Sequence, residues 1–187
     1  MAVLTSKQKT LLANAFIEQG ALVMCIGNPD TLTGAWPEPY SDSYPQPEIS
    51  DTTEIINPIA YKLLGDGAVI DPVTQSTIAF AKVDNVNGTV EYNGSMYAIT
   101  TSFSEAINNG YTSVYVKGTL IRTEVDPLIA YRIVGLFIQT IGIFDGETNV
   151  ALPAAITSPG ILTLISNRKP VYRDTDQSEV IELIIPF

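Results

Sequence analysis

The stretch SEVIELIIPF, residues 178–187, alternates in the way that a β-strand requires. Successive side chains of a strand point to opposite faces of the sheet. One face here is wholly apolar and consists of Ile181, Leu183, Ile185 and Phe187. The other face is mixed and consists of Val180, Glu182, Ile184 and Pro186. We therefore expect the apolar face to be buried, in this chain's own sheet or in a partner's. Pro186 cannot donate to a ladder, so the strand ends there or lies at an edge.

Further strands are expected upstream of this segment. Runs rich in β-branched and aromatic residues are separated by turn signals such as Asn93-Gly94, and they span residues 76–84, 88–102, 112–122, 130–144 and 160–166. The stretch EYNGSMYAI has the form of a hairpin, and residues 101–110 can add one helical turn that ends at Gly110. We predict an α+β fold that is mostly β, with an antiparallel sheet or sandwich core.

Two helices are expected before these strands. Residues 5–19 form the first, with Thr5 or Ser6 as its cap and an apolar face of Leu11, Leu12, Ala15 and Phe16. The apolar run 21–27 that follows reads as a buried strand. Asp51 and Glu54 resemble a capping box for a second helix over residues 51–64, which Pro58 kinks or delays.

Residues 28–50 form a Pro-rich arm. Its prolines exclude a helix or a central strand, and Trp36, Tyr40 and Tyr44 lie among them. These rings either cover the chain's own core or contact a partner. We predict a segment 1–50 with helix, strand and arm, and a β-rich core over 51–187, together forming one compact domain.

The composition favours protein partners. Only 16% of the 187 residues are charged, and the formal net charge is −10. Such a field repels phosphate, so nucleic acid is not expected as a partner. No apolar run approaches the roughly 20 residues that cross a membrane, and no signal peptide is expected. The single cysteine, Cys25, lies in an apolar run and is expected to be a buried hydrophobe rather than a reactive thiol.

No residue pattern indicates catalysis. The chain has no histidine, and with one cysteine it has no thiolate set for zinc, so we expect no enzyme, no cofactor and no metal. Two carboxylate pairs, Asp145 with Glu147 and Glu124 with Asp126, flank predicted turns, where such residues usually cap the backbone. Glycan hydrolysis by one of these pairs is the enzymatic alternative.

Three stretches carry a family resemblance. The first, residues 160–187, has a strand, the turn Asn167-Arg168-Lys169-Pro170, the sequence DQSE and a closing strand. The second has LVMCIG, Trp36 and PEPYSDSYPQP, and the third has Lys117 followed by Tyr131-Arg132. Together they resemble the baseplate wedge proteins of T4-type contractile-tailed bacteriophages known as gene product eight. The family protein is much larger, so this chain looks like a shortened version.

The resemblance implies a structural subunit of the tail baseplate, made in the host cytoplasm and built into the virion. It implies a homodimer that joins neighbouring baseplate subunits within a ring, with Arg168 and Lys169 held outward by their turn. The expected interface residues are Trp36, Tyr40, Tyr44, Arg132, Asn167, Arg168, Lys169 and Phe187. A neck or tail-completion protein and a carbohydrate- or receptor-binding β domain are the alternatives.

Overall fold

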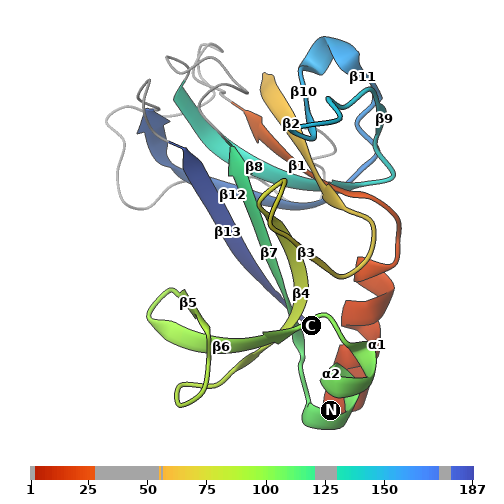
Figure 1. The fold of residues 1–187 in the computed structure, drawn as a ribbon, viewed down its shortest axis with the longest axis vertical. Helices are drawn as coiled ribbons and strands as arrows, with labels where there is room; N and C mark the ends of the chain where they lie inside the picture. Colours follow the sequence, from red (N-terminus) through yellow and green to blue (C-terminus); the bar gives the residue numbers. More distant parts are fainter. Residues whose placement is uncertain (1–2, 28–54, 56, 121–129, 173–177) are drawn as a thin grey trace. The chain divides into compact units, whose positions relative to one another are not determined.

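The computed structural model describes residues 3–27, 55, 57–120, 130–172 and 178–187. It is mostly β, with an N-terminal helix and antiparallel pairing wherever a register is described, so the predicted fold class is confirmed (Figure 1). The chain forms two compact units. Unit 1 comprises residues 1–20, 64–119 and 180–187, and unit 2 comprises residues 21–63 and 120–179. The predicted division at residue 50 falls outside the described residues and stays a prediction.

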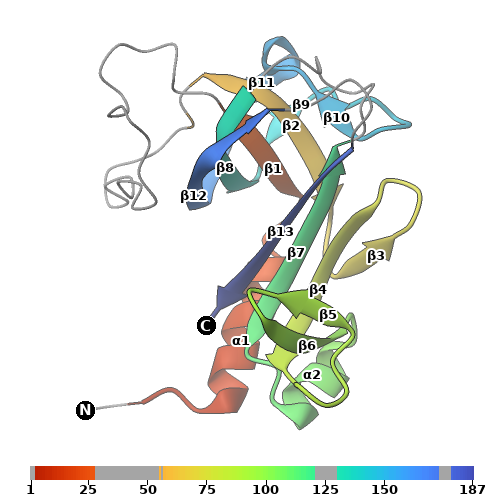
Figure 2. The same ribbon diagram turned by 90° about the vertical axis from the view of Figure 1, so that its left-hand side faces the viewer.

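Unit 1 is built on a sheet of order β13-β7-β4-β6-β5, with β3 (Val69–Asp71) beside β4. Its strands are β4 (Ser76–Val83), β5 (Val90–Tyr92), β6 (Ser95–Thr100), β7 (Ser113–Leu120) and β13 (Glu179–Pro186). Strand β13 lies beside β7 at one edge of the sheet (Figure 2). Ile181 and Leu183 are buried and Val180 is exposed, so the predicted faces of this strand are confirmed.

Local turn chemistry sets the other end of this sheet. Asn93 and Gly94 have φ of 49° and 76°, as a two-residue hairpin turn requires, and they join β5 to β6. The predicted helical turn is α2 (Phe103–Asn109), and Gly110 ends it with a left-handed φ of 71°. Both elements were predicted at the right place.

The first helix, α1 (Ser6–Ile17), starts as predicted, because Thr5 and Gln8 form a reciprocal capping box. Its predicted apolar face was wrong. The helix buries Thr10, Ala13 and Ile17, whereas Leu11 and Leu12 are 50% and 46% exposed. Small residues let the helix approach α2 closely, and the Thr10 hydroxyl lies 2.7 Å from the Tyr111 carbonyl oxygen and 3.0 Å from that of Ser6.

Replacing Thr10 should therefore weaken unit 1 although the residue is polar. Thr10→Val keeps the shape but removes a buried hydrogen bond, and we expect the free energy of unfolding to fall by about 1–3 kcal/mol. Thr140→Val is the matched control, because the Thr140 hydroxyl donates over the same 2.7 Å to Pro159 at an exposed site. Urea denaturation of both variants gives the comparison. An equal, small loss in both would contradict a role for the Thr10 bond.

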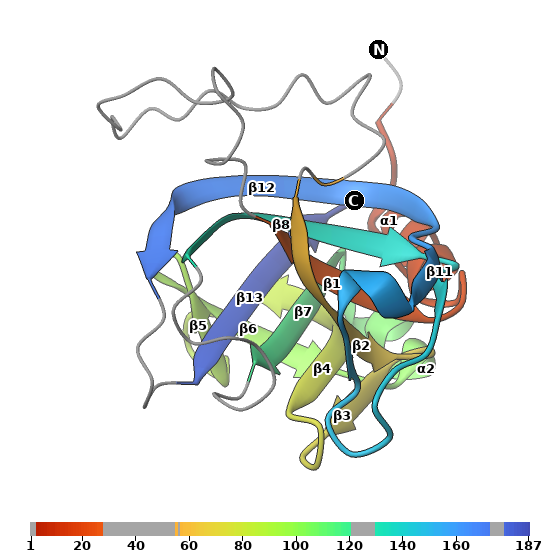
Figure 3. The same cartoon turned by 90° about the horizontal axis from the view of Figure 1, so that it is seen from above.

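Unit 2 is built on a sheet of order β10-β2-β1-β8-β12. Its strands are β1 (Leu22–Gly27), β2 (Pro58–Gly65), β8 (Ala130–Ile138), β10 (Val150–Ala151) and β12 (Ile161–Tyr172). Strands β8 and β12 run side by side along the sheet (Figure 3). The predicted strand at 21–27 is β1, and all six of its residues are buried.

The expectation for Cys25 is also confirmed. The residue is 0% exposed in the middle of β1, and burial raises the pKa of its thiol far above the usual range. A thiol held protonated and out of solvent reacts slowly with thiol reagents. Cys25 packs in the core of unit 2 with Val23, Ile55, Tyr61, Ile133, Phe137 and Ala151.

Two predicted elements were wrong. The helix expected to reach Leu64 is instead strand β2 from Pro58 onward, between β1 and β10. A strand flanked on both sides is apolar on both faces, so its pattern cannot be told from that of a short helix. Pro58 fits at the first strand position, where no ladder N–H is needed. The Asp51–Glu54 capping box lies outside the described residues.

The turn predicted at Asn167–Pro170 lies inside β12. Asn167 pairs with Ile133 and Val171 with Tyr131, so a step of four residues along β12 faces a step of two along β8. The extra residues form a bulge, which accommodates the N–H that Pro170 lacks. Turn residues thus interrupt the pairing here without reversing the chain.

Candidate interaction surfaces

Few of the predicted interface residues have described side chains. Trp36, Tyr40 and Tyr44 lie outside the described residues. Arg132 is in β8 and Asn167–Lys169 are in β12, but the placement of these side chains also lies outside what the structure describes. For all of these the interface role stays a prediction.

Phe187 is held within unit 1. Its ring centroid lies 5.7 Å from that of Phe16 on α1, and its N–H donates to the Thr112 carbonyl oxygen over 3.1 Å. The ring is only partly exposed. These contacts fasten the end of β13 to unit 1, which answers the expectation that this apolar strand is tied down in its own sheet.

Two motifs of the family resemblance meet in unit 2. Tyr131 is 0% exposed, and its hydroxyl donates to the Glu179 carboxylate over 2.6 Å. Tyr131 comes from the third stretch of the resemblance, and Glu179 is the last residue of DQSE. The two stretches are far apart in the sequence, so this buried hydrogen bond gives them a shared structural role.

A second such pairing lies between β7 and β13 in unit 1. The Tyr115 hydroxyl donates to a Glu182 carboxylate oxygen over 2.7 Å, and the Lys117 ammonium lies 3.9 Å from the same oxygen. Burial, and then the hydrogen bond and charge of Glu182, raise the pKa of Tyr115 well above its ordinary value. The group thus fastens the edge strand as a neutral phenol bonded to a carboxylate.

Alkaline pH should weaken this fastening. The tyrosine keeps its proton in the folded state to a higher pH than in the unfolded state, so its contribution is complete below about pH 10 and is lost as pH rises further. Tyr115→Phe lacks both the bond and this titration. We expect the variant to be less stable than the parent at pH 8, and the gap to narrow by pH 11. Urea unfolding at both values measures it; a gap that widens would contradict the account.

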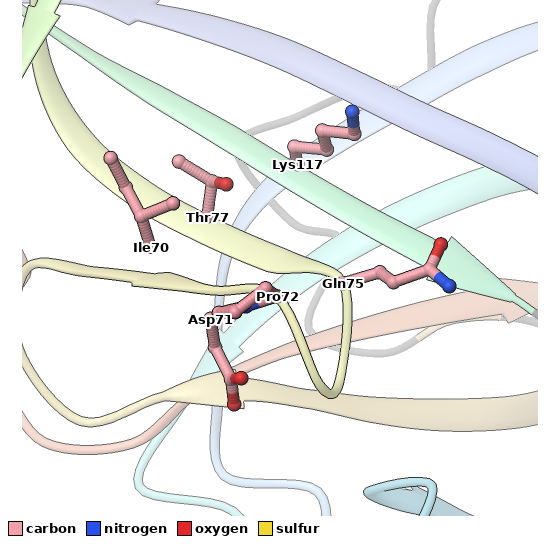
Figure 4. Close-up of a pocket in the computed structure, with 6 residues that line it drawn as sticks. All are labelled: Ile70, Asp71, Pro72, Gln75, Thr77 and Lys117. Carbon is pink, nitrogen blue, oxygen red and sulfur yellow. The ribbon is translucent and has the colours of Figure 1, made fainter.

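A shallow hollow of about 230 Å³ lies beside these strands in unit 1 (Figure 4). Its lining includes Asp71, Gln75 and Lys117. The carboxylate of Asp71 is engaged by its own turn, because it accepts from the N–H groups of Val73 and Thr74 and from the Thr74 hydroxyl. The hollow therefore offers few free polar groups to a ligand.

The carboxylate pair on unit 2 has a similar local role. Asp145 accepts hydrogen bonds from the N–H groups of Glu147 and Thr148 and from the Thr148 hydroxyl. The bond from Thr148, followed by that from Glu147, lowers the pKa of Asp145. Asp145 is therefore a turn cap, as the sequence indicated. The other pair, Glu124 and Asp126, lies outside the described residues.

Unit 1 carries an exposed apolar surface on α1. We define the α1 surface as Val3, Leu4, Leu11 and Leu12, which are 81%, 49%, 50% and 46% exposed. A shallow hollow of about 320 Å³ is lined by Leu4, Leu11, Leu12 and Gln8. The sequence analysis assigned two of these leucines to the core. Their helical spacing was recognised correctly, but the face they occupy is the outer one.

Unit 2 carries an exposed apolar surface of its own. We define the ribbon surface as Ile141, Ile143, Leu152 and Ile161, which are 62%, 79%, 57% and 55% exposed. It follows β9 (Ile141–Gly142), its partner β11 (Ile156–Ser158) and the short helix η2 (Pro153–Ala155) between β10 and β11. Ile141 and Ile143 are two residues apart and share a face. Sequence analysis missed this surface, because it read residues 130–144 as one strand.

The base of the ribbon is held rigidly. Lys62 is 0% exposed on β2, and its ammonium donates to the Thr148 carbonyl oxygen over 2.7 Å. The N–H of Leu63 donates to Asn149, and that of Ile143 donates to Ala155. The apolar side chains of the ribbon surface are therefore presented by an ordered element.

A comparison with protein families identifies the chain. Residues 1–187 match the family described as baseplate wedge 3 tail fiber network component, and the chain belongs to that family. The resemblance to baseplate wedge proteins is confirmed, and the chain has a structural role in the phage tail baseplate. No curated protein matches it. None of the described helices is long and apolar enough to cross a membrane.

Proposed function

We propose that this chain is a non-catalytic wedge subunit that joins neighbouring subunits in the baseplate of a contractile tail. The observation that carries the proposal is that each compact unit has its own exposed apolar surface. A subunit that joins others needs at least two contact surfaces. The α1 surface on unit 1 and the ribbon surface on unit 2 meet this requirement.

Both surfaces suit protein contacts. Burying one large apolar side chain contributes about 1.5–3 kcal/mol. Four such residues on each surface therefore offer a substantial driving force for association. The low charge content, 16%, limits the cost of desolvating the surroundings. Grouped apolar side chains on an ordered surface are typical of interaction sites.

The described polar groups support a structural role more than a catalytic one. Asp145 and Asp71 cap turns, and Glu182 bonds Tyr115 and Lys117 between two strands. Each has a structural partner, which leaves it unsuited to act as a general acid or base. The further contacts through Trp36, Tyr40, Tyr44, Arg132, Asn167, Arg168 and Lys169 and the homodimer belong to this proposal as predictions from the family resemblance.

The ribbon surface gives the test. Ile143→Asp places a charge on an exposed position of that surface, so folding should be unaffected while assembly suffers. We expect occupancy in purified baseplates to fall at least tenfold, since about 1.4 kcal/mol corresponds to tenfold in binding. The measurement is quantitative mass spectrometry after complementation of a phage that lacks the gene.

Val86→Asp is the matched control. Val86 is 89% exposed and lies in unit 1 outside both surfaces, so this variant should be incorporated like the parent. Equal incorporation of both variants would show that the ribbon surface is not a joint. Circular dichroism of both purified variants verifies that they fold.

A further inference from the structure

The two faces of α1 are opposite in character to those of an ordinary surface helix. The inner face is made of small or polar side chains with Ile17, and the outer face is a stripe of Leu4, Gln8, Leu11, Leu12 and Ala15. These positions recur at intervals of four, three, one and three residues, which is the spacing of a helix–helix contact. The stripe leaves the hollow of about 320 Å³ open beside Gln8.

Charges border this stripe on one flank. Lys7 and Glu18 are eleven residues apart, and at about 100° per residue they differ in direction by only about 20° around the helix axis. Both are exposed and lie on the Leu11 side of the stripe. Glu18 is the acidic residue of this helix and its C-terminal cap. One flank therefore carries a cation near one end and an anion at the other.

This arrangement is complementary to itself. Lys7 and Glu18 are equally far from the point between Leu12 and Ala13. A two-fold axis crossing the helix near that point brings the same flanks of two helices together in opposite directions, so Lys7 of each copy lies beside Glu18 of the other. The stripe also matches itself when reversed: Gln8 meets Ala15, and Leu11 and Leu12 meet at the centre. A parallel pair instead brings Lys7 beside Lys9 and leaves Glu18 without a cation.

We propose that α1 pairs with α1 of a second copy of this chain, antiparallel, about a two-fold axis near Leu11 and Leu12. The proposal rests on the proposed joining function, because it names the occupant of one of the two surfaces. A contact of one short helix per copy is smaller than the roughly 1,200 Å² typical of stable complexes. The pair is therefore weak in dilute solution and forms where copies are held close together, as in an assembly.

Cysteine cross-linking of the full chain tests the pairing. Cys25 is 0% exposed, so an introduced thiol on α1 is the reactive one. Under mild oxidation we expect Leu11→Cys to form a disulfide dimer at least tenfold faster than Val86→Cys, the control for random collision. Lys7→Cys and Glu18→Cys copies should cross-link to each other when mixed but not alone. Rapid cross-linking of Leu4→Cys alone indicates a parallel pair and overturns the proposal, as does the absence of the Leu11→Cys dimer.

A charge exchange gives an independent readout. In the Leu11→Cys background, Lys7→Glu and Glu18→Lys each place like charges together across the axis, and we expect each to slow cross-linking about fivefold. The double exchange restores opposite charges and should restore the rate. Failure of that rescue overturns the antiparallel pairing. If the chain occupies baseplates but these copies do not cross-link, the pairing fails while the joining function stands.

Discussion

Gly135→Val is expected to lower the free energy of unfolding by about 3 kcal/mol or more, at the upper end of what overpacking costs. Gly135 lies in the middle of β8, between Cys25 on β1 and Ile165 on β12. A Cβ at this position would lie 2.7 Å from Cδ1 of Ile55 and 3.0 Å from Cδ1 of Leu162. The missing side chain is therefore what lets Ile55 enter the core of unit 2.

The control and the rescue follow from the same contacts. Gly146→Ala adds a methyl group with no heavy atom within 4 Å and should leave stability within about 0.5 kcal/mol. Gly135→Ala combined with Ile55→Ala should be more stable than the sum of the two single changes predicts, because each removes the other's problem. Urea denaturation followed by circular dichroism measures all four. Strict additivity would show that Ile55 does not occupy this space.

The second large effect concerns assembly. A chain carrying both Leu11→Asp and Ile143→Asp is expected to fold but to have its occupancy in baseplates reduced at least a hundredfold. Leu11 and Ile143 belong to different units, so the two losses should act independently and multiply. At least tenfold for each surface, about 1.4 kcal/mol, gives the combined value. Quantitative mass spectrometry of baseplates from complemented phage measures it.

A matched double variant separates this effect from added charge. Val73→Asp with Val86→Asp adds the same two charges at positions that are 78% and 89% exposed and belong to neither surface. This control should be incorporated normally. If the double surface variant is incorporated as well as either single one, the two surfaces do not act as separate joints.

Elements defined by short-range patterns were predictable from the sequence. The alternation in β13 gave its buried face correctly, and the hairpin at Asn93-Gly94 and the end of α2 at Gly110 follow from residues that tolerate positive φ. These signals succeed because the determining interactions lie within a few residues.

The errors share a physical cause, which is that tertiary partners override local patterns. The leucines of α1 were placed inside because apolar residues usually are, but Thr10 and its bond to Tyr111 fix the opposite face inward. The residues around Pro170 have turn chemistry, yet pairing with β8 carries β12 past them. Strand β2 was read as a helix because both of its faces are apolar and it lies between two other strands.

The candidate surfaces were largely missed for a related reason. Within residues 130–144 the polar pair Gln139-Thr140 was the signal that the strand is interrupted, and Gln139 indeed has a positive φ of 59°. Beyond that point the apolar residues belong to the ribbon surface instead of the core. The family, by contrast, was recognisable, because its motifs include the Tyr131–Glu179 pair that the fold brings together.

Quantitative mass spectrometry of purified phage particles, repeated on baseplates detached from their tails, tests the joining function most directly. A subunit of a closed ring occurs in a multiple of the ring's rotational order. We predict that the chain is present in detached baseplates at a small whole multiple of that order. Its absence from particles, or its presence only in the neck fraction, would contradict the account.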